Sequence, residues 1–356
     1  MSPPNIRLMD GGLGTLLTSP PHNITFTHDH PLWSSHLLTS KEGEKELARA
    51  QRSFVDAGAD ILLSATYQAS FEGFGGTKVR YGRQEEGIGE GVGEEEAGRC
   101  MRRGVGVARE CFDGGKGTVV LGLGAYGAIM IPGAEYSGVY DEGHRSVEEL
   151  REWHGYRMNA FKSEKDCWRE VDMVAFETIP VRKEVEAVRE VMAGVNERDG
   201  RRFWISCVFP GEGNVLPDGS SVGEVVEAML GKRSEGADDT PYAIGINCTK
   251  VGKVESLILE FEEAVEGLLE SHATALSRVP ALVLYPDGTM GEVYNTTTKV
   301  WEKKEDTTGP WHETIFEIVK RTRERNKWQE ILLGGCCKTT PSDIAKLRKR
   351  IDELQG

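Results

Sequence analysis

The chain has 356 residues, with 43 Lys and Arg against 57 Asp and Glu, which gives a formal net charge of −14. This acidic balance argues against a general nucleic-acid binder, which needs a basic face to displace counterions from phosphate. No run approaches the ~18–20 apolar residues of a membrane span, and the N-terminus lacks the charged-then-apolar pattern of a secretory signal. We therefore expect a cytoplasmic protein, whose seven cysteines, an odd number, argue against a disulfide scaffold.

Eight apolar, β-branched runs bounded by turn residues follow one another along the chain. Most are unbroken rather than alternating, which is typical of parallel strands buried on both faces. The predicted strands are Ile6–Met9, Ile61–Ala65, Val119–Leu123, Met173–Phe176, Phe203–Phe209, Ala243–Ile246, Ala281–Tyr285 and Ile331–Leu333.

Helical patterns with readable caps lie between these runs. Capping boxes are expected at Thr39 with Glu42, at Ser146 with Glu149, and at Ser221 with Glu224. Strand then helix, repeated eight times, predicts fold class α/β, a single (β/α)8 TIM-type barrel domain over residues 1–356; a doubly wound open sheet is the rival. The Gly/Glu-rich stretch 85–98 is expected to be a flexible, solvated loop.

In such a barrel, functional residues collect where strands end and the following loops begin. The segments after five of the predicted strands carry polar residues, thiols and glycines. They are 10–15, 66–70, 177–180, 247–249 and 334–337. The fold therefore brings two carboxylates and three thiols to one mouth.

The thiols are Cys248 and the adjacent pair Cys336 and Cys337. Their spacing alone leaves three interpretations open: inert buried cysteines, a redox-active vicinal pair, or a metal site. The barrel favours the metal site, because three thiolates at one mouth can hold zinc in a tetrahedral site with one position open, the catalytic arrangement.

The carboxylates are Asp10 and Glu177. They are either an acid/base pair or the partners of a substrate ammonium group; alternatively, Asp10 caps its own loop and Glu177 pairs with a buried Arg or Lys. Gly11, Gly12 and Gly14 free backbone N–H groups that can bind a substrate carboxylate. Together these features would recognise an α-amino acid.

Two further patterns carry less weight. His22, His28, His30 and His36 cluster in one early loop, but no regular element fixes their spacing for a metal. The segment 122–127 matches G-x-G-x-x-G after a strand, yet Ile-Met-Ile-Pro follows where a dinucleotide-binding fold needs a helix.

Five motifs, in order and covering nearly the whole chain, resemble the homocysteine S-methyltransferase family. They are Asp10-Gly-Gly-Leu-Gly-Thr15, Thr66-Tyr-Gln-Ala-Ser70, Glu177-Thr-Ile-Pro180, Gly245-Ile-Asn-Cys248 and Gly334-Gly-Cys-Cys-Lys-Thr-Thr-Pro341. The resemblance implies a (β/α)8 barrel with Zn²⁺ held by Cys248, Cys336 and Cys337 at the C-terminal mouth. It also implies homocysteine as substrate, held by the Asp10 loop and Glu177. The expected substrate-binding residues are Asp10, Gly11, Gly12, Thr66, Gln68, Glu177 and Asn247.

The chemistry implied is methyl transfer from a small sulfonium donor, S-methylmethionine or S-adenosylmethionine, to the homocysteine thiolate, which gives methionine. No catalytic residue is required beyond that zinc-bound thiolate, because metal coordination deprotonates a thiol. Trp33 is a candidate aromatic wall near the sulfonium. Betaine as the donor, a thiol redox protein and a non-catalytic zinc-binding barrel are the alternatives. We expect a monomer or small homo-oligomer without nucleic-acid or membrane partners.

Overall fold

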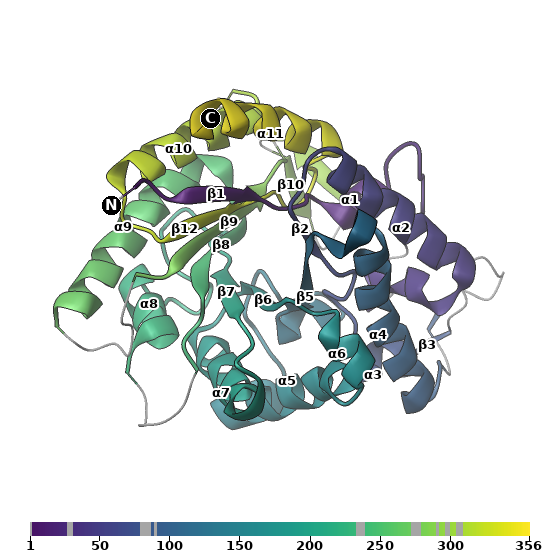
Figure 1. The fold of residues 1–356 in the computed structure, drawn as a ribbon. Helices are drawn as coiled ribbons and strands as arrows, with labels where there is room; N and C mark the ends of the chain where they lie inside the picture. The colour runs from purple at the N-terminus through teal and green to yellow at the C-terminus, as the bar shows by residue number, and fades with distance from the viewer. Residues whose placement is uncertain are drawn as a thin grey trace.

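The computed structural model describes residues 2–26, 31–78, 87–88, 91–232, 239–271, 279–289, 292–295, 300–303 and 309–356. Eight parallel strands form one sheet in the order β1-β12-β9-β8-β7-β6-β5-β2 (Figure 1). A parallel bridge between Met9 and Ile61 joins the two ends of this order, so the sheet closes into a barrel. The strands are β1 (Asn5–Leu8), β2 (Ile61–Leu63), β5 (Thr118–Gly124), β6 (Met173–Ile179), β7 (Phe203–Cys207), β8 (Ala243–Lys250), β9 (Ala281–Asp287) and β12 (Glu330–Leu333). All eight predicted strands and the barrel class are confirmed.

The larger helices form a ring outside the strands (Figure 1). They are α2 (Lys41–Asp56), α4 (Glu94–Glu110), α5 (Val147–Lys162), α7 (Arg182–Asp199), α8 (Val222–Leu230), α9 (Val251–Glu270), α10 (Trp311–Arg325) and α11 (Pro341–Gln355). None of the helices that the structure describes is long and apolar enough to cross a bilayer.

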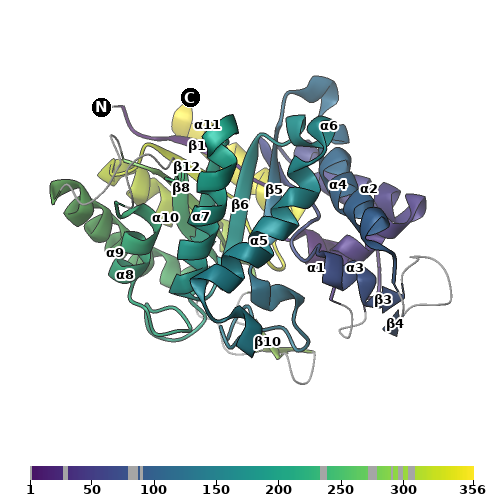
Figure 2. The ribbon, with the colours of Figure 1, turned by 90° about the horizontal axis from the view of Figure 1, so that it is seen from below.

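The remaining helices and strands are short. They are α1 (Leu13–Leu17), η1 (Trp33–Thr39), α3 (Phe71–Gly75), β3 (Thr77–Lys78), β4 (Gly87–Ile88), η2 (Asp113–Gly115), η3 (Tyr126–Ile129), η4 (Glu142–His144), α6 (Lys165–Arg169), β10 (Glu292–Asn295) and β11 (Val300–Lys303). Figure 2 shows α1, α3 and β10 at the end of the barrel opposite to the two chain termini. That end is the mouth, because α1 and α3 lie in the loops that leave β1 and β2.

The helix caps agree with the sequence in two of three places. Both Ser146 and Ser221 form the expected capping boxes. The box expected at Thr39 is wrong, because Thr39 ends η1 and its hydroxyl donates to the His36 carbonyl at 2.7 Å. The next residue, Ser40, is extended and caps α2 by accepting from the Gly43 N–H at 3.0 Å.

The stretch 85–98 is not a loop throughout. Residues 94–98 form the start of α4, where three consecutive glutamates occupy the first turn and favour the positive end of the helix dipole. Ala97 and Gly98 are buried, so this end of α4 packs on the molecule. Residues 85, 86, 89 and 90 lie outside the described residues.

Side chains alternate across each strand with period two, and this alternation decides what faces the barrel interior. On β6, Met173 and Ala175 belong to the cluster inside the barrel, whereas Val174 and Phe176 pack against the helices. The next inward position on β6 is Glu177. The same count places Asn247 of β8 inward, so the strand register itself delivers two polar side chains to the mouth.

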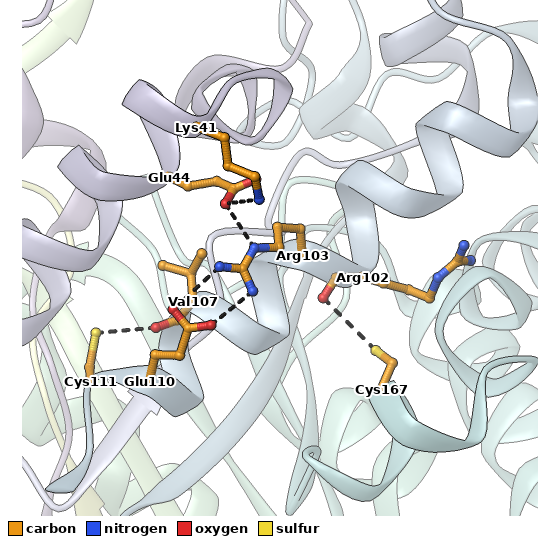
Figure 3. Close-up of polar contacts among 8 residues, drawn as sticks. All are labelled: Lys41, Glu44, Arg102, Arg103, Val107, Glu110, Cys111 and Cys167. Carbon is orange, nitrogen blue, oxygen red and sulfur yellow. Dashed lines mark hydrogen bonds and ion pairs between the residues drawn. The ribbon is translucent and has the colours of Figure 1, made fainter.

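Polar contacts link the neighbouring helices α2, α4 and α6 of the ring (Figure 3). Arg103 of α4 donates to Glu44 of α2 at 2.8 Å and to Glu110 at 2.9 Å. Two free cysteines, Cys111 and Cys167, direct Sγ toward backbone carbonyls of α4 at 3.2 and 4.0 Å. These thiols therefore serve helix packing, far from the mouth.

Candidate metal and substrate site

Three cysteine sulfurs gather where β8 and β12 end. Cys248 lies in the last part of β8, and Cys336 and Cys337 follow β12. The three Sγ atoms all lie within 4.8 Å of one another. In the described part of the chain they form the only group of three His, Cys, Asp or Glu residues close enough to share a metal ion.

The structure shows these thiols in an oxidised state. A disulfide joins Cys248 and Cys336, whose Cα atoms are 5.5 Å apart, and Cys337 is free. The vicinal pair Cys336–Cys337, considered above as a redox couple, is not the bonded pair; its sulfurs are 3.9 Å apart. Three thiolates are available only after the disulfide is reduced.

The environment of the free thiol favours a cation. Burial raises the pKa of Cys337 to about 12, so the thiol stays protonated at neutral pH unless a positive charge binds it. Three converging thiols of this kind are the ligand set of soft divalent metals, and zinc is the commonest of these. The residues present therefore fit a bound metal.

The backbone at the site is strained. Thr178, Cys248 and Lys338 have φ of 61°, 47° and 61°, the left-handed region that residues other than glycine avoid. Such conformations cost about 1–3 kcal/mol each and persist only where the surroundings impose them. All three residues lie at the ends of strands or directly beside the thiols. The local structure of the site therefore imposes these backbone conformations.

The Asn247 side chain holds one of these strained residues. Its Oδ1 accepts from the Thr178 N–H at 2.8 Å, and its Nδ2 donates to the Thr178 hydroxyl at 2.7 Å. That hydroxyl in turn lies 3.8 Å from Cys248 Sγ. Asn247 is fully buried. Its amide is thus committed to supporting the thiol site, which differs from the direct substrate contact that we expected.

The glycine loop after β1 packs against the cysteine segment. A Cβ on Gly12 would come within 2.4 Å of the Cys336 carbonyl oxygen, so only glycine allows this approach. The Gly12 N–H already donates to the Thr339 hydroxyl at 3.0 Å. The Gly12 N–H therefore already has a partner within the protein, and a role for Gly12 in substrate binding stays a prediction. Gly11 also packs closely on Thr339 and on the Phe54 ring.

Two buried carboxyl groups face the mouth. Asp10 is 6% exposed and accepts from the Leu63 N–H at 3.0 Å; Glu177 is 7% exposed. Burial raises the pKa of Glu177 to about 7. Burial, and then the charge of Glu177, raise the pKa of Asp10 above its ordinary range. Two neighbouring carboxyls that resist ionisation favour a cationic ligand between them.

Thr66 and Gln68 fasten the segment after β2 to its neighbours. The Thr66 hydroxyl donates to the Gly122 carbonyl at 2.8 Å, and the Gln68 amide donates to the Ala128 carbonyl at 2.7 Å. Thr66 is completely buried and Gln68 is half-buried. The hydroxyl of Thr66 is therefore used within the barrel, whereas Gln68 lies at the edge of the mouth.

The glycines of the G-x-G-x-x-G segment make room for other residues. A Cβ on Gly122 would come within 2.9 Å of Glu177 Oε1, and a Cβ on Gly124 would come within 2.6 Å of the Tyr67 ring. The 3-10 helix η3 follows β5 instead of an α-helix. The segment therefore shapes the mouth, and no α-helix begins at the place where a dinucleotide-binding fold needs one.

Sequence reasoning missed two side chains at the mouth, Tyr67 and Glu135. The charges of Glu135, Glu177 and Cys337 all act on the Tyr67 phenol, which places these groups together. Burial raises the pKa of Glu135 to about 7, and its Oε2 has no hydrogen-bond partner among the described residues. The sequence did carry a signal for both: Tyr67 stands inside a motif that resembles the family, and the dipeptide Glu135-Tyr136 resembles a family segment as well, although neither residue was among the expected substrate-binding residues.

The histidine cluster does not form a metal site among the described residues. His22 pairs with Glu46 at 3.1 Å, and His36 is buried in η1; His28 and His30 lie outside the described residues. Trp33 packs against the glycine loop: a Cβ on Gly14 would come within 2.5 Å of its Nε1. This places Trp33 next to the loop that begins at Asp10.

The fold and the site together define a (β/α)8 barrel with a three-thiol metal-type site and two buried carboxyls at its C-terminal mouth. The sequence model of homocysteine S-methyltransferase matches residues 7–351. Homocysteine S-methyltransferase 1 of Arabidopsis thaliana is 28% identical over 95% of this chain and 90% of its own length. A selenocysteine Se-methyltransferase of Brassica oleracea var. italica is 30% identical over 97% of this chain and 88% of its own length.

Among solved structures, the oxidized form of the homocysteine methyltransferase MmuM from Escherichia coli superposes with a TM-score of 0.67. It is 25% identical and covers 97% of this chain and 96% of its own. The chain belongs to the homocysteine S-methyltransferase family. It is a methyltransferase, and the family supports homocysteine as the methyl acceptor, which confirms the resemblance found in the sequence.

Proposed function

We propose that this enzyme moves a methyl group from a sulfonium donor to the thiol of homocysteine, with Zn²⁺ held by Cys248, Cys336 and Cys337. The observation that carries the proposal is the convergence of the three Sγ atoms within 4.8 Å at the barrel mouth. When bound there, zinc would hold the acceptor thiol as its thiolate at neutral pH, the nucleophile that methyl transfer requires.

The amino-acid part of homocysteine fits the carboxyl groups. We assign its ammonium group to Asp10 and Glu177, because a cation between them offsets the cost of ionising two buried carboxyls. We assign Gly11 and Gly12 to the wall of this part of the site, because Gly11 packs closely on Thr339 and Gly12 packs closely on the Cys336 carbonyl. Gln68 is half-buried at the edge of the mouth with its Nε2 bonded to the Ala128 carbonyl, and we assign its Oε1 to the substrate.

We assign the donor side to the Trp33 ring and the Glu135 carboxyl group. A sulfonium carries a positive charge, which the partly buried Glu135 carboxylate and the face of Trp33 can both attract. S-methylmethionine and S-adenosylmethionine are the donors that this charge favours, and betaine is the alternative. Attraction to both ends of the pocket aligns the donor carbon with the acceptor sulfur.

The reaction needs no further acid or base. The sulfonium C–S bond breaks, its electron pair stays on the donor sulfur, and the leaving group departs as a neutral thioether. The new C–S bond forms with the homocysteine sulfur, whose proton has already passed to solvent. The chain's own residues therefore bind, orient and exclude water, while the barrel core holds them in place.

We further propose that the enzyme acts in the cytoplasm, as a monomer or small homo-oligomer. Five of the seven cysteines are free, which suits a reducing compartment. A reducing compartment would also keep Cys248 and Cys336 as thiols.

The test is methionine formation from homocysteine by the reduced, zinc-loaded protein, with S-methylmethionine, S-adenosylmethionine and betaine offered separately. We expect turnover with a sulfonium donor. In Cys337→Ser we expect the rate of methionine formation to fall at least 1000-fold and the zinc content to fall with it. Cys207→Ser, at a buried free thiol of β7, is the matched control and should retain activity. A zinc-loaded wild type that turns over none of the three donors would leave a non-catalytic barrel as the better account.

A further inference from the structure

One buried arginine has partners that the proposed chemistry leaves unexplained. Arg157 of α5 is 1% exposed, and its guanidinium donates to four backbone carbonyls. Nε bonds Ala69 O at 2.7 Å, Nη1 bonds Gly124 O at 2.8 Å, and Nη2 bonds Thr66 O at 2.8 Å and Tyr67 O at 2.5 Å. One side chain thus ties the segment after β2 to the last residue of β5 and to an outer helix.

The tied segment, residues 66–69, forms one wall of the mouth. Its Tyr67 ring fills the space over Gly124, and its Gln68 amide bonds the Ala128 carbonyl at 2.7 Å. The Tyr67 carbonyl accepts both from Arg157 and from the Gly124 N–H, the latter at 2.9 Å. A shift of this backbone would therefore displace the side chains that line the substrate pocket.

Burying the charge of Arg157 costs more free energy than a residue with only a packing role would require. No ion pair within 4 Å joins its guanidinium to a carboxylate of the described residues, and the charges of Glu72, Glu177 and Glu184 act on it only from farther away. Its Cζ lies 5.2 Å from the centroid of the Trp153 ring. Burying a cation without an adjacent counter-ion costs free energy, which the hydrogen bonds to the four carbonyls offset. An apolar side chain would fill the same volume between α5 and the sheet without that cost, so the fork of donors is the feature that the site requires.

We propose that Arg157 is a positioning residue for the methyl acceptor: its guanidinium fixes the backbone of residues 66–69 so that Tyr67 and Gln68 form the homocysteine pocket. This inference rests on the proposed function. It requires a planar fork, because four carbonyls in different directions need donors on three separate nitrogens. A lysine at this position keeps the charge but has all its donors on one atom.

The test compares Arg157→Lys with a matched control, Arg189→Lys. Arg189 is also 1% exposed and also donates to backbone carbonyls, among them those of Ala228 and Gly231; it differs in pairing with the Asp239 carboxylate at 3.0 Å, and it ties α7 to the segment after α8, away from residues 66–69. Homocysteine affinity is measured by titration calorimetry on the reduced, zinc-loaded proteins, together with zinc content and melting temperature. Both variants should melt earlier, whereas only Arg157→Lys should weaken homocysteine binding, by at least tenfold.

A homocysteine Kd within twofold of wild type in folded, zinc-loaded Arg157→Lys overturns the inference. If that variant does not fold, Trp153→Phe perturbs the guanidinium more gently and should raise the Kd about threefold; an unchanged Kd there overturns it too. A wild type that binds homocysteine but transfers no methyl group refutes the proposed function and leaves this comparison intact. A wild type that does not bind homocysteine at all overturns both.

Discussion

The carboxyl group of Glu177 gives the sharpest prediction about the acceptor site. Burial raises its pKa to about 7 from an ordinary value of 4.5, a difference that corresponds to roughly 3 kcal/mol disfavouring the carboxylate. The substrate ammonium would recover part of this free energy through a charge-assisted hydrogen bond, worth about 1.5–3 kcal/mol. Since each 1.4 kcal/mol is a factor of ten, Glu177→Gln should raise the KM for homocysteine roughly 10- to 150-fold.

The sign of the pH dependence follows from the same pKa. Below about pH 7 the Glu177 carboxyl is protonated and cannot pair with an ammonium group, so the wild-type KM for homocysteine should rise as the pH falls through 7. Glu177→Gln should show little of this dependence. Because the folded protein keeps a proton that the unfolded chain releases, the Glu177 contribution to stability falls as the pH rises from about 4.5 to 7, and the variant should lose that slope.

The assay is initial-rate kinetics on reduced, zinc-loaded protein between about pH 6 and pH 8, with the donor saturating. Glu135→Gln is the matched control, because the pKa of Glu135 is also raised to about 7 by burial but we place this residue on the donor side. Its KM for homocysteine should stay within threefold of the wild type. A Glu177→Gln enzyme with an unchanged KM, or a wild-type KM that is flat across this range, would refute the assignment of the ammonium group.

Three further predictions follow from the same site. Glu135→Gln should raise the KM for the sulfonium donor severalfold, which steady-state kinetics with donor varied would show. Asn247→Ala should weaken zinc binding by about 10- to 100-fold in a chelator competition, as losses of ligand-supporting contacts do; Asn214→Ala, at a surface amide bonded to Ser256 and Glu260, should not. Removal of zinc by a chelator should abolish methyl transfer, re-addition should restore it, and far-ultraviolet circular dichroism should barely change, because the barrel core does not depend on the thiol site.

The fold was predictable because its signals are local and repeated. Unbroken apolar runs mark buried parallel strands, and period-two alternation on β6 alone places Glu177 inward once the strand is located. The Ser146 and Ser221 caps were readable for the same reason. The cap at Thr39 was misplaced by one residue because η1 runs through it, and a 3-10 turn leaves no distinct pattern in the sequence.

The site was only partly predictable, because hydrogen bonding between distant segments decides which polar groups are free. The sequence brings Asn247 to the mouth but cannot show that its amide is used twice by Thr178. Likewise, the Gly12 N–H is taken by Thr339, 327 residues away. The sequence gives a weak signal for Arg157: this charged residue lies on the same helical face as Leu150 and Phe161, which are both buried.

The most direct test of the central claim is the sulfur coordination of zinc in the reduced wild-type protein, measured by X-ray absorption spectroscopy with and without homocysteine. We predict three protein sulfur ligands, from Cys248, Cys336 and Cys337, and a fourth sulfur when homocysteine is added. A ligand set that does not change on addition of homocysteine, in protein shown to contain one zinc per chain, would contradict it.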